Sequence, residues 1–297
     1  MKYLLHLSLF LLLLCRPSFV NSQVTADLVG DRIEIRIKGD LFTSYILSEH
    51  EKYPFFFPVN GPSKANVTSM RNALYPHHSS LFFGCDKVNG GNYWQEGLDR
   101  GQIIPLRADI IESGKDRVVI ENENIWKRPG AMAPIKDLRI ITVTTPSPEI
   151  YQIDFVITME MLLDVIIEKT NHSLFSIRMD PDLAVVNGGT MVNAEGQTGE
   201  NDTFGQPSPW MDCHGNRMGK SEGMAILQHP SNPWYPSPWF TRDYGFFSPT
   251  PMYWPENGNT SKFNNGDKVT LRYRVLVHSG SHLEANIAAQ FEKYTAE

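Results

Sequence analysis

Residues 32–38 read RIEIRIK, and their pattern is the clearest indication of the fold class. Its isoleucines alternate strictly with charged residues, so an extended chain would carry all of them on one face. That pattern is typical of a strand in an antiparallel sheet with one face in the core and the other in solvent. Gly39-Asp40 then reads as a turn, and residues 41–47 are predicted to return as the second arm of a hairpin.

Alternating or apolar runs of strand length recur along the rest of the chain. Further strands are predicted at residues 53–59, 104–112, 117–126, 136–145, 149–158, 161–170, 173–179, 209–215, 223–229 and 267–278. Near the end, Ser281 is expected to cap a short helix. Its apolar stripe would be Leu283, Ile287, Phe291 and Tyr294. We predict an all-β fold, a large antiparallel β-sandwich (super-sandwich) with long loops and a short C-terminal helix, with a barrel as the alternative.

Three segments rich in glycine, asparagine or proline are predicted to be loops: 85–103, 183–206 and 230–260. The density of proline in the last of them argues against a regular helix or a central strand. Long ordered loops of this kind are usually functional. Because no internal repeat or low-complexity linker is visible, residues 23–297 are predicted to form a single β-sandwich domain.

Residues 1–22 have the pattern of a secretory signal peptide. Lys2 precedes an apolar run at 4–14, and modest or small residues follow at the expected cleavage position. No later run approaches the roughly 18 apolar residues of a membrane span. We therefore expect a periplasmic or extracellular protein with no membrane partner after signal removal.

The charge balance argues against nucleic acid as a partner. Cleavage after residue 22 removes Lys2 and Arg16 and no acids, which leaves 25 basic against 33 acidic residues and a net charge of −8. Phosphate binding needs a basic stripe, and the sequence has none.

Two cysteines, Cys85 and Cys213, remain in the mature chain. In an oxidising compartment they could pair, and the long loop would make the disulfide worth roughly 4–5 kcal/mol in the chain-entropy model. Two buried free thiols are the alternative, and the sequence leaves both open.

The first candidate site is residues 70–84, which read MRNALYPHHSSLFFG. His77 and His78 would face opposite sides of a strand, whereas in a turn both could reach one cleft. Arg71 lies in a segment otherwise suited to burial, so it needs a fixed partner, either a structural carboxylate or a substrate oxygen. Trp94 and Glu96 belong to the next loop and are expected on the same face as the two histidines.

A second group of polar residues surrounds Asp212. His214 is two positions further on, so the two side chains would share one face of a strand. A carboxylate beside a histidine is how general acids and bases are positioned, although such pairs are also common on plain surfaces. His278 closes the last strand, where it could emerge into a cleft or cap the following helix.

A third group lies at the start of the proline-rich loop. His229 closes an apolar run, and Arg242 and Tyr244 follow within the loop. Together these side chains suit an oxygen-rich ligand such as a sugar or a sugar acid. The alternative is an internal network of Arg242 with Asp243 that holds the loop in place.

Known cofactor and metal motifs are absent from the sequence. The mature chain has eight histidines, yet no HxH, HExxH or comparable spacing is present, so no metal ligands are predicted. The chain also lacks a GxSxG elbow, a P-loop and a dinucleotide fingerprint. We therefore predict no cofactor.

Five motifs carry a family resemblance: 53–84 (YPFFFPVNGPSKANVTSMRNALYPHHSSLFFG), 92–97 (NYWQEG), 210–215 (WMDCHG), 229–249 (HPSNPWYPSPWFTRDYGFFSP) and 271–280 (LRYRVLVHSG). Together they resemble a PmoA-like secreted bacterial family, labelled methane oxygenase, over most of the mature chain. The size, the strand count and the His/Arg cleft also resemble the galactose-mutarotase-type super-sandwich. That resemblance implies an epimerase, a sugar lyase or a sugar-binding module.

Three functions are therefore open. The first is an enzyme acting on a carbohydrate as an epimerase, lyase or hydrolase, in which His78, His229, Asp212 and His278 move protons. The substrate would then be held by Arg71, His77, Trp94, Glu96, Arg242 and Tyr244. The second is a non-catalytic carbohydrate-binding protein that stacks sugars on Trp94, Trp234 and Trp239. The third is a metal-dependent oxygenase-like protein, as the family label implies. The enzyme hypothesis predicts that the histidines and arginines of the three groups converge on one pocket.

Overall fold

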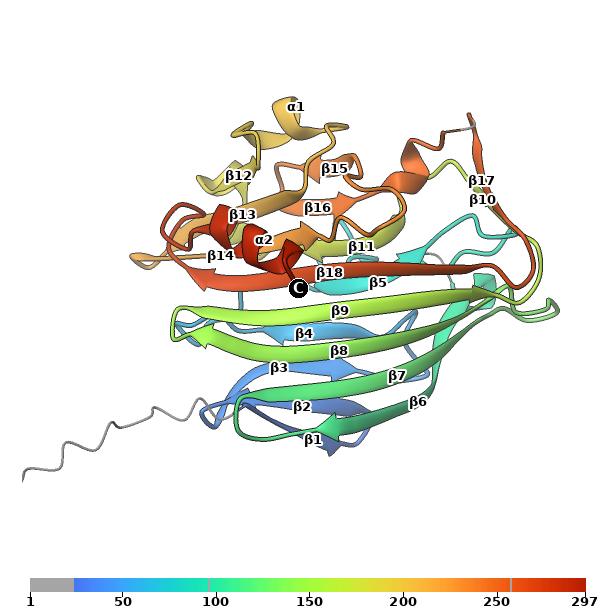
Figure 1. The fold of residues 1–297 in the computed structure, drawn as a ribbon, viewed down its shortest axis with the longest axis horizontal. Helices are drawn as coiled ribbons and strands as arrows, with labels where there is room; N and C mark the ends of the chain where they lie inside the picture. Colours follow the sequence, from blue (N-terminus) through green and yellow to red (C-terminus); the bar gives the residue numbers. More distant parts are fainter. Residues whose placement is uncertain (1–23, 96, 257) are drawn as a thin grey trace, which may run out of the picture.

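Two large antiparallel sheets packed face to face make up most of the molecule (Figure 1). This computed structural model describes residues 24–95, 97–256 and 258–297 of the 297-residue chain. The predicted signal peptide at 1–22 and the candidate residue Glu96 lie outside the described residues. The fold is the predicted β-sandwich and not the alternative barrel.

The first sheet has eight strands, and the N-terminal half of the chain supplies five of them in sequence order. Its spatial order is β1 (Val24–Val29), β2 (Arg32–Ile37), β3 (Asp40–Ile46), β4 (Phe55–Val59), β5 (Leu81–Cys85), β11 (Ser173–Arg178), β16 (Phe246–Pro249) and β15 (Trp239–Arg242).

The second sheet also has eight strands, and most of it is a long meander. Its spatial order is β12 (Thr190–Asn193), β13 (Trp210–Arg217), β14 (Lys220–Gln228), β18 (Lys268–Ser279), β9 (Ile150–Met161), β8 (Ile135–Ser147), β7 (Arg117–Lys127) and β6 (Gln102–Glu112). A separate two-stranded ribbon pairs β10 (Val165–Glu168) with β17 (Thr260–Phe263).

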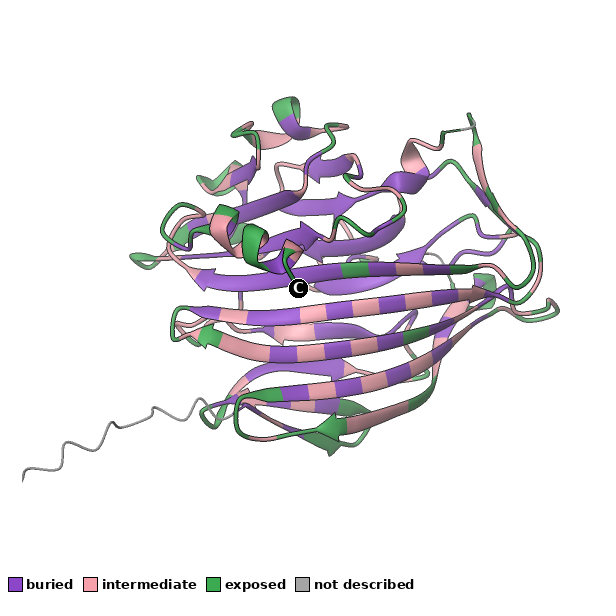
Figure 2. Ribbon diagram, in the orientation of Figure 1, coloured by how far each residue is buried: buried purple, intermediate pink, exposed green. Residues whose placement is uncertain are grey.

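Alternation along the strands builds the core between the sheets. In β2 the three isoleucines are buried, while Arg32, Glu34 and Arg36 form ion pairs with one another on the other face. Figure 2 shows the same alternation of buried and half-buried residues along β7, β8 and β9. Aromatic rings join the two sheets, as where Phe56 of β4 meets Phe155 of β9 edge-on with ring centroids 5.6 Å apart.

A buried ion pair also lies between the sheets. Asp137 and Arg139 of β8 are 0% and 3% exposed, and their side chains are joined by two hydrogen bonds of 2.8 and 3.1 Å. The second carboxylate oxygen of Asp137 also accepts a 2.7 Å bond from the indole nitrogen of Trp126. The full set of partners explains how two charges are accommodated in an apolar core.

Helical structure is short and peripheral. The helices are α1 (Gly199–Thr203) and α2 (Ile287–Thr295), with single 3₁₀ turns at Leu98–Arg100, Pro181–Leu183, Val185–Asn187 and Pro251–Tyr253. No helix in the described ranges is long and apolar enough to cross a membrane. Helix α2 packs on the outer face of the second sheet (Figure 1), where Ile287 and Tyr294 join a small apolar cluster with Leu276 of β18.

Several expectations from the sequence need correction. The C-terminal helix begins after Asn286 and not at Ser281, which instead forms a turn with Glu284. Leu283 is therefore outside the apolar stripe and is 77% exposed. The segment expected as a loop at 183–206 contains the edge strand β12 and helix α1.

The proline-rich segment contains a strand in the interior of a sheet, which was not expected. Strand β16 lies between β11 and β15 in the first sheet. The prolines flank the two strands, and the one inside β16, Pro249, is its last residue, so the ladder loses little. The prediction was wrong because it rested on the proline density of the whole segment, whereas β16 has its one proline at its last position.

Cys85 and Cys213 are free, buried thiols. Cys85 lies in β5 of the first sheet and Cys213 in β13 of the second, and both are 0% exposed. Of the two alternatives that the sequence left open, the structure shows the pair of buried thiols.

Candidate functional site

A cavity of about 630 Å³ opens where the loops before β4, before β5 and after β5 meet. Its size is within the range of small-molecule sites. It is lined by His50, Glu51, Lys52, Tyr53, Arg71, Pro76, His77, Ser79, Trp94, Gln95 and Leu98. We call it the loop cavity.

The floor of the loop cavity rests on the outer face of the first sheet. In β5, Phe83 points inward to Trp126 of the second sheet, so its neighbour Phe82 must point outward. Tyr53 stacks on Phe82 with ring centroids 4.8 Å apart, and Trp94 meets the same ring edge-on at 4.7 Å. The alternation of a single strand thus provides the aromatic wall.

Arg71 lies at the cavity wall and forms an ion pair with Glu51. Its guanidinium also stands 5.5 Å from the centre of the Phe55 ring. The backbone of Arg71 has φ of +51°, a left-handed conformation that is uncommon for a residue with a side chain. A hydrogen bond from its N–H to the carbonyl of His78 helps to hold it there. Backbone strain of this kind often accompanies functional sites.

The two adjacent histidines have different surroundings. His77 is half-buried and lines the loop cavity, whereas His78 is 4% exposed and stacks on Phe246 of β16 at 4.5 Å. Burial, assisted by His77 and Arg178, lowers the pKa of His78 to about 2. Burial and the neighbouring His172 also lower the pKa of His77. The cavity histidine is therefore His77, which was predicted to bind substrate, and not His78, which was predicted to be catalytic.

His172 and Asp86 form a pair that the sequence did not reveal. The Nδ1 atom of His172 lies 3.0 Å from a carboxylate oxygen of Asp86, and the ring of His172 is 5.6 Å from that of His77. Strand pairing explains their meeting, because Cys85 is opposite Ser173 in the β5–β11 ladder and each residue is one step beyond that pair. The carboxylate orients the imidazole in the way that general acids and bases are oriented.

Behind the cavity wall lies a layer of buried polar atoms without hydrogen-bond partners among the described residues. These atoms are Nδ1 of His78, Oδ1 of Asp86, Nε1 of Trp94, Oγ of Ser176, and Nε and Nη1 of Arg178. Arg178 is 3% exposed, and its guanidinium stands over the rings of Tyr244 at 4.3 Å and Tyr75 at 5.1 Å. Burial lowers the pKa of Arg178. Unpartnered buried polar atoms are costly, so this layer lowers the stability of the fold.

Of the residues predicted in the proline-rich loop, only Tyr244 approaches this layer. It stacks on Tyr75 with ring centroids 4.2 Å apart, and burial raises its pKa to about 12. Arg242 instead pairs with Glu200 at 2.8 Å and stands 4.1 Å from the ring of Phe240. Arg242 thus takes part in an internal network, but its partner is Glu200 and not the expected Asp243, whose backbone N–H also bonds Glu200.

His229 lies on the far side of the sandwich from the loop cavity. It contacts Tyr294 of α2 edge-on at 5.1 Å and lines a separate cavity of about 150 Å³ with Arg272 and Arg274. Burial and these two arginines lower its pKa.

Asp212 and His278 are buried in the second sheet, both 0% exposed. The sequence correctly placed Asp212 and His214 on one face, since Nδ1 of His214 lies 2.6 Å from Oδ1 of Asp212. His278 bonds the other carboxylate oxygen at 2.7 Å and does not emerge into a cleft. The predicted convergence of all three groups on one pocket is wrong: Arg71, His77 and Trp94 share the loop cavity, and the other groups are elsewhere.

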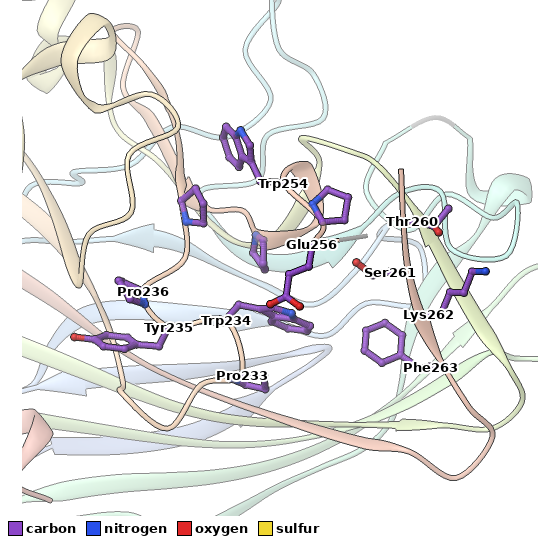
Figure 3. Close-up of a pocket in the computed structure, with 13 residues that line it drawn as sticks. Pro233, Trp234, Tyr235, Pro236, Trp254, Glu256, Thr260, Ser261, Lys262 and Phe263 are labelled. Carbon is purple, nitrogen blue, oxygen red and sulfur yellow. The ribbon is translucent and has the colours of Figure 1, made fainter. Parts of the chain in front are cut away.

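A second concave surface lies between the proline-rich loop and β17. This groove has a volume of about 450 Å³, and Figure 3 shows it between Trp234, Trp254 and Phe263. The rings of Trp234 and Phe263 are nearly perpendicular at 6.3 Å, and Glu256 and Lys262 provide charges at the rim. Trp239 does not reach it, because that side chain is 0% exposed.

The fold and the loop cavity define a β-sandwich protein with an imidazole and an ion pair in a cavity of small-molecule size. A family model described as "Family of unknown function (DUF6807)" matches residues 32–292, so the chain belongs to this family. The narrower PmoA-like resemblance stays a prediction. A search of curated proteins found no match.

Two solved structures are similar at a low level. One is a polysaccharide lyase, 12% identical, with a TM-score of 0.34 over 88% of this chain and 33% of that chain. The chain therefore spans about a third of the length of the lyase. The other is a galactose mutarotase related enzyme from Lactobacillus acidophilus, 7% identical, with a TM-score of 0.34 over 87% of this chain and 97% of that chain.

Proposed function

We propose that this protein is an enzyme that acts on an acidic carbohydrate in the loop cavity. One observation carries the proposal: His77 and the Arg71–Glu51 ion pair line one cavity of about 630 Å³. Carbohydrate sites need flat apolar walls for the sugar ring and a few well-placed charged groups for its oxygens. The loop cavity offers the charged groups, whereas the rings of Tyr53 and Trp94 are 2% and 1% exposed and support its floor.

His77 is the proposed proton acceptor. Its lowered pKa keeps the imidazole neutral at neutral pH, with a lone pair available to take a proton from the substrate. The His172–Asp86 pair behind it supplies a second imidazole, held in one orientation, that can return a proton when the ring carries a proton on both nitrogens. Two imidazoles near one cavity suit reactions that remove a proton on one side and deliver one on the other.

Arg71 is the proposed anchor for a sugar carboxylate. Its guanidinium can bind a carboxylate through two parallel hydrogen bonds, and in the free protein Glu51 occupies that position. A cation there would also stabilise the negative charge that develops when a base removes the proton next to the carboxylate. Epimerisation and elimination on a uronate are therefore the favoured reactions, with hydrolysis as the alternative.

The test is to incubate the protein with uronate-containing and neutral oligosaccharides. Anomer exchange, epimerisation and bond cleavage would be followed by NMR, and elimination by the absorbance of the unsaturated product. We expect turnover of a uronate, and we expect His77→Ala to lower kcat by roughly 10²–10⁴-fold, the range for loss of a general base. His229→Ala is the matched control and should retain activity. Equal loss in both variants, or turnover that survives His77→Ala, would contradict the proposal.

A second candidate function is non-catalytic binding of a carbohydrate chain in the groove between Trp234 and Phe263. The half-buried aromatic rings with charges at the rim favour it. Sugar-dependent quenching of tryptophan fluorescence that is lost in Trp234→Ala but kept in His77→Ala would support this function. Quenching that is lost only in His77→Ala would instead place the sugar in the loop cavity.

We also propose that residues 1–22 direct the chain to the periplasm or the cell exterior, where it would encounter polysaccharides. The apolar run and the cleavage pattern support this. Mass spectrometry of the protein isolated from its native host should give an N-terminus at Gln23. A retained residue 1 would contradict the proposal.

A further inference from the structure

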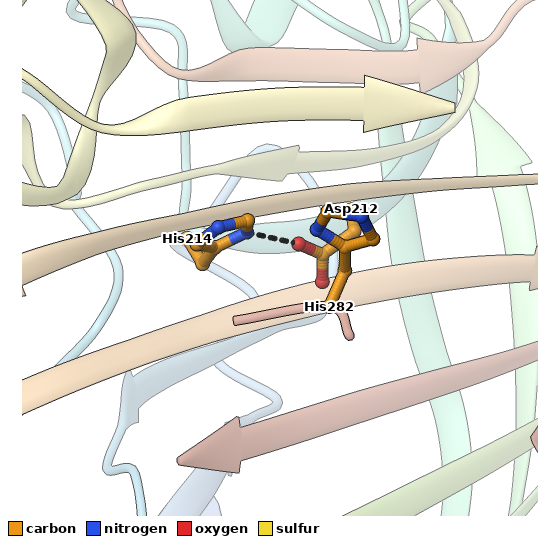
Figure 4. A group of neighbouring side chains, drawn as sticks. All are labelled: Asp212, His214 and His282. Atoms are coloured by element: carbon orange, nitrogen blue, oxygen red, sulfur yellow. Dashed lines mark hydrogen bonds and ion pairs between the residues drawn. The ribbon is translucent and has the colours of Figure 1, made fainter. Parts of the chain in front are cut away.

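A cluster of imidazoles and one carboxylate lies between the second sheet and the C-terminal turn. Strand β13 supplies Asp212 and His214 on one face because they are two residues apart. The turn that follows β18 places His282 over the same face, and Figure 4 shows the three side chains together. This cluster is on the outer face of the second sheet and does not take part in the loop cavity.

Asp212 orients the imidazoles around it. Its Oδ1 atom is 2.6 Å from Nδ1 of His214, and its Oδ2 atom is 2.7 Å from Nε2 of His278. The other ring nitrogen of His278 faces the carbonyl of Ser279 at 3.3 Å, so both nitrogens of that ring are engaged. His214 differs, because only its Nδ1 atom meets the carboxylate. When the ring proton is on Nε2, the lone pair of Nδ1 and the Oδ1 atom of Asp212 can bind one ion in place of their hydrogen bond.

His282 provides an independent observation. Its Nδ1 atom is buried and has no hydrogen-bond partner in the described part of the chain. An orphaned polar atom of this kind destabilises a fold unless something fills its place. The rings of His282 and His214 have centroids 5.3 Å apart, and one donor atom each from Asp212, His214 and His282 lies within 4.8 Å of the other two.

The backbone around the cluster makes room for the rings. Gly223 of β14 lies beneath them, and a Cβ atom there would be 2.5 Å from Cβ of His214 and 2.9 Å from Cε1 of His278. The turn that carries His282 is held by Ser281 and Glu284, whose side chains bond each other at 2.8 Å. Gly223 on one side of the cluster and the Ser281–Glu284 turn on the other thus keep the imidazoles close together.

We propose that Asp212, His214 and His282 form a binding site for a divalent transition-metal ion, with Zn²⁺ as the best fit. Two imidazole nitrogens and one carboxylate oxygen are a ligand set that Zn²⁺ takes, at about 2.0–2.2 Å from each donor. Donors around such an ion are roughly 3.3 Å apart, so small rotations of the rings bring the cluster to binding distance. The ion would give the orphaned nitrogen of His282 a partner and fasten the C-terminal segment to the second sheet.

The test uses the purified full chain, stripped with a chelator and then given Zn²⁺ alone. Calorimetry and elemental analysis after dialysis should show one bound ion per chain, and the melting temperature should rise on addition of Zn²⁺. Co²⁺ in place of Zn²⁺ should give the visible absorption of a four-coordinate site.

His282→Ala is the decisive variant, because the residue lies in a surface turn and the chain should still fold. We expect it to weaken Zn²⁺ binding by more than the roughly 10–100-fold typical of losing a supporting residue, and to abolish the thermal gain. His77→Ala and His229→Ala are matched controls that should keep both. The proposal would be overturned if the wild-type chain did not retain one Zn²⁺ ion, or if His282→Ala retained it. The cluster would then be a set of hydrogen bonds without a metal.

Discussion

The loop cavity and the Asp212 cluster use similar side chains in opposite ways. In the cavity layer, buried donors such as those of Arg178 and Trp94 have no partners among the described residues. In the cluster, both carboxylate oxygens of Asp212 are bonded, each to a different histidine. A region that leaves donors unsatisfied sacrifices stability for binding, whereas a region that satisfies its charged groups adds stability. The two faces of the sandwich thus differ in how far their buried charged groups are satisfied, and Nδ1 of His282 is the unpartnered atom of the cluster among the described residues.

We expect the largest loss in the free energy of unfolding when the Asp212 cluster is disrupted. Asp212→Ala leaves His278 fully buried with its main partner removed. Breaking a buried pair in this way destabilises a fold by about 3–5 kcal/mol. Denaturant unfolding of the metal-free protein measures it, with Asp109→Ala, an exposed ion-pair residue, as the control. A loss as small as that of the control would mean that the cluster adds no stability.

The second comparison uses two buried arginines. Arg139 has the carboxylate of Asp137 as its partner, whereas Nε and Nη1 of Arg178 have none in the described chain. Arg139→Met should therefore cost about 3–5 kcal/mol, because it leaves Asp137 charged and buried. Arg178→Met should change the free energy of unfolding by no more than about 1 kcal/mol, since relief of desolvation offsets the lost stacking. Equal losses in the free energy of unfolding in the two variants would show that the partnered and the unpartnered arginine do not differ in their effect on stability.

The stability of the Asp212 cluster should depend on pH. Burial alone would raise the pKa of Asp212, but His278 and His214 overcome this and lower it. Burial alone would lower the pKa of His278, and Asp212 raises it instead. The contribution of Asp212 is full above about pH 3.9 and is lost as the pH falls through its lowered pKa. The contribution of His278 to the free energy of unfolding is complete below about pH 6.5 and is lost as the pH rises through its raised pKa.

The stability difference between the wild-type chain and Asp212→Asn should therefore be greatest between about pH 4 and 6.5 and shrink on both sides. For each group, the limit is about 1.4 kcal/mol per unit of pKa shift. His282 also lies near Asp212, and burial lowers its pKa, so the upper edge should be broad. Unfolding in guanidinium at several pH values measures the difference. A difference that stays constant from pH 4 to 9 would be the contrary result.

The smallest effect on stability is expected at the mouth of the loop cavity. The Arg71 and Glu51 side chains are 38% and 23% exposed, so Glu51→Gln should change the free energy of unfolding by less than about 1 kcal/mol. The same change frees Arg71, so affinity for a uronate should rise while affinity for a neutral sugar stays the same. Calorimetric titration with both sugars distinguishes the two effects. A lower affinity for the uronate would show that Glu51 itself contacts the sugar.

Much of the fold could be predicted from local patterns. The alternation in residues 32–38 and the longer runs that became β6 to β9 identified strands and their buried faces, because a period of two depends only on neighbouring residues. Strand β16 was missed because its four residues carry too little pattern beside so many prolines.

The candidate site was only partly predictable. Arg71 and His77 share a short stretch of chain, and Trp94 follows one strand later, so one loop region could be expected to gather them. His172 carried no comparable signal, since it meets Asp86 only through the pairing of β5 with β11 across a long separation in sequence. The unpartnered state of Arg178 is likewise a property of its surroundings and not of its own position in the chain.

The sequence by itself therefore determined the all-β class, the boundaries of most strands, the shared face of Asp212 and His214, and the residues at the cavity mouth. Each of these depends on side-chain spacing along a few residues of extended chain. The tertiary structure alone decided which groups meet: it placed His77 in a cavity, buried His78 and His278, and brought His282 to Asp212. Those outcomes follow from strand order and sheet packing, which bring together residues far apart in the sequence. No periodic pattern along the chain connects such residues.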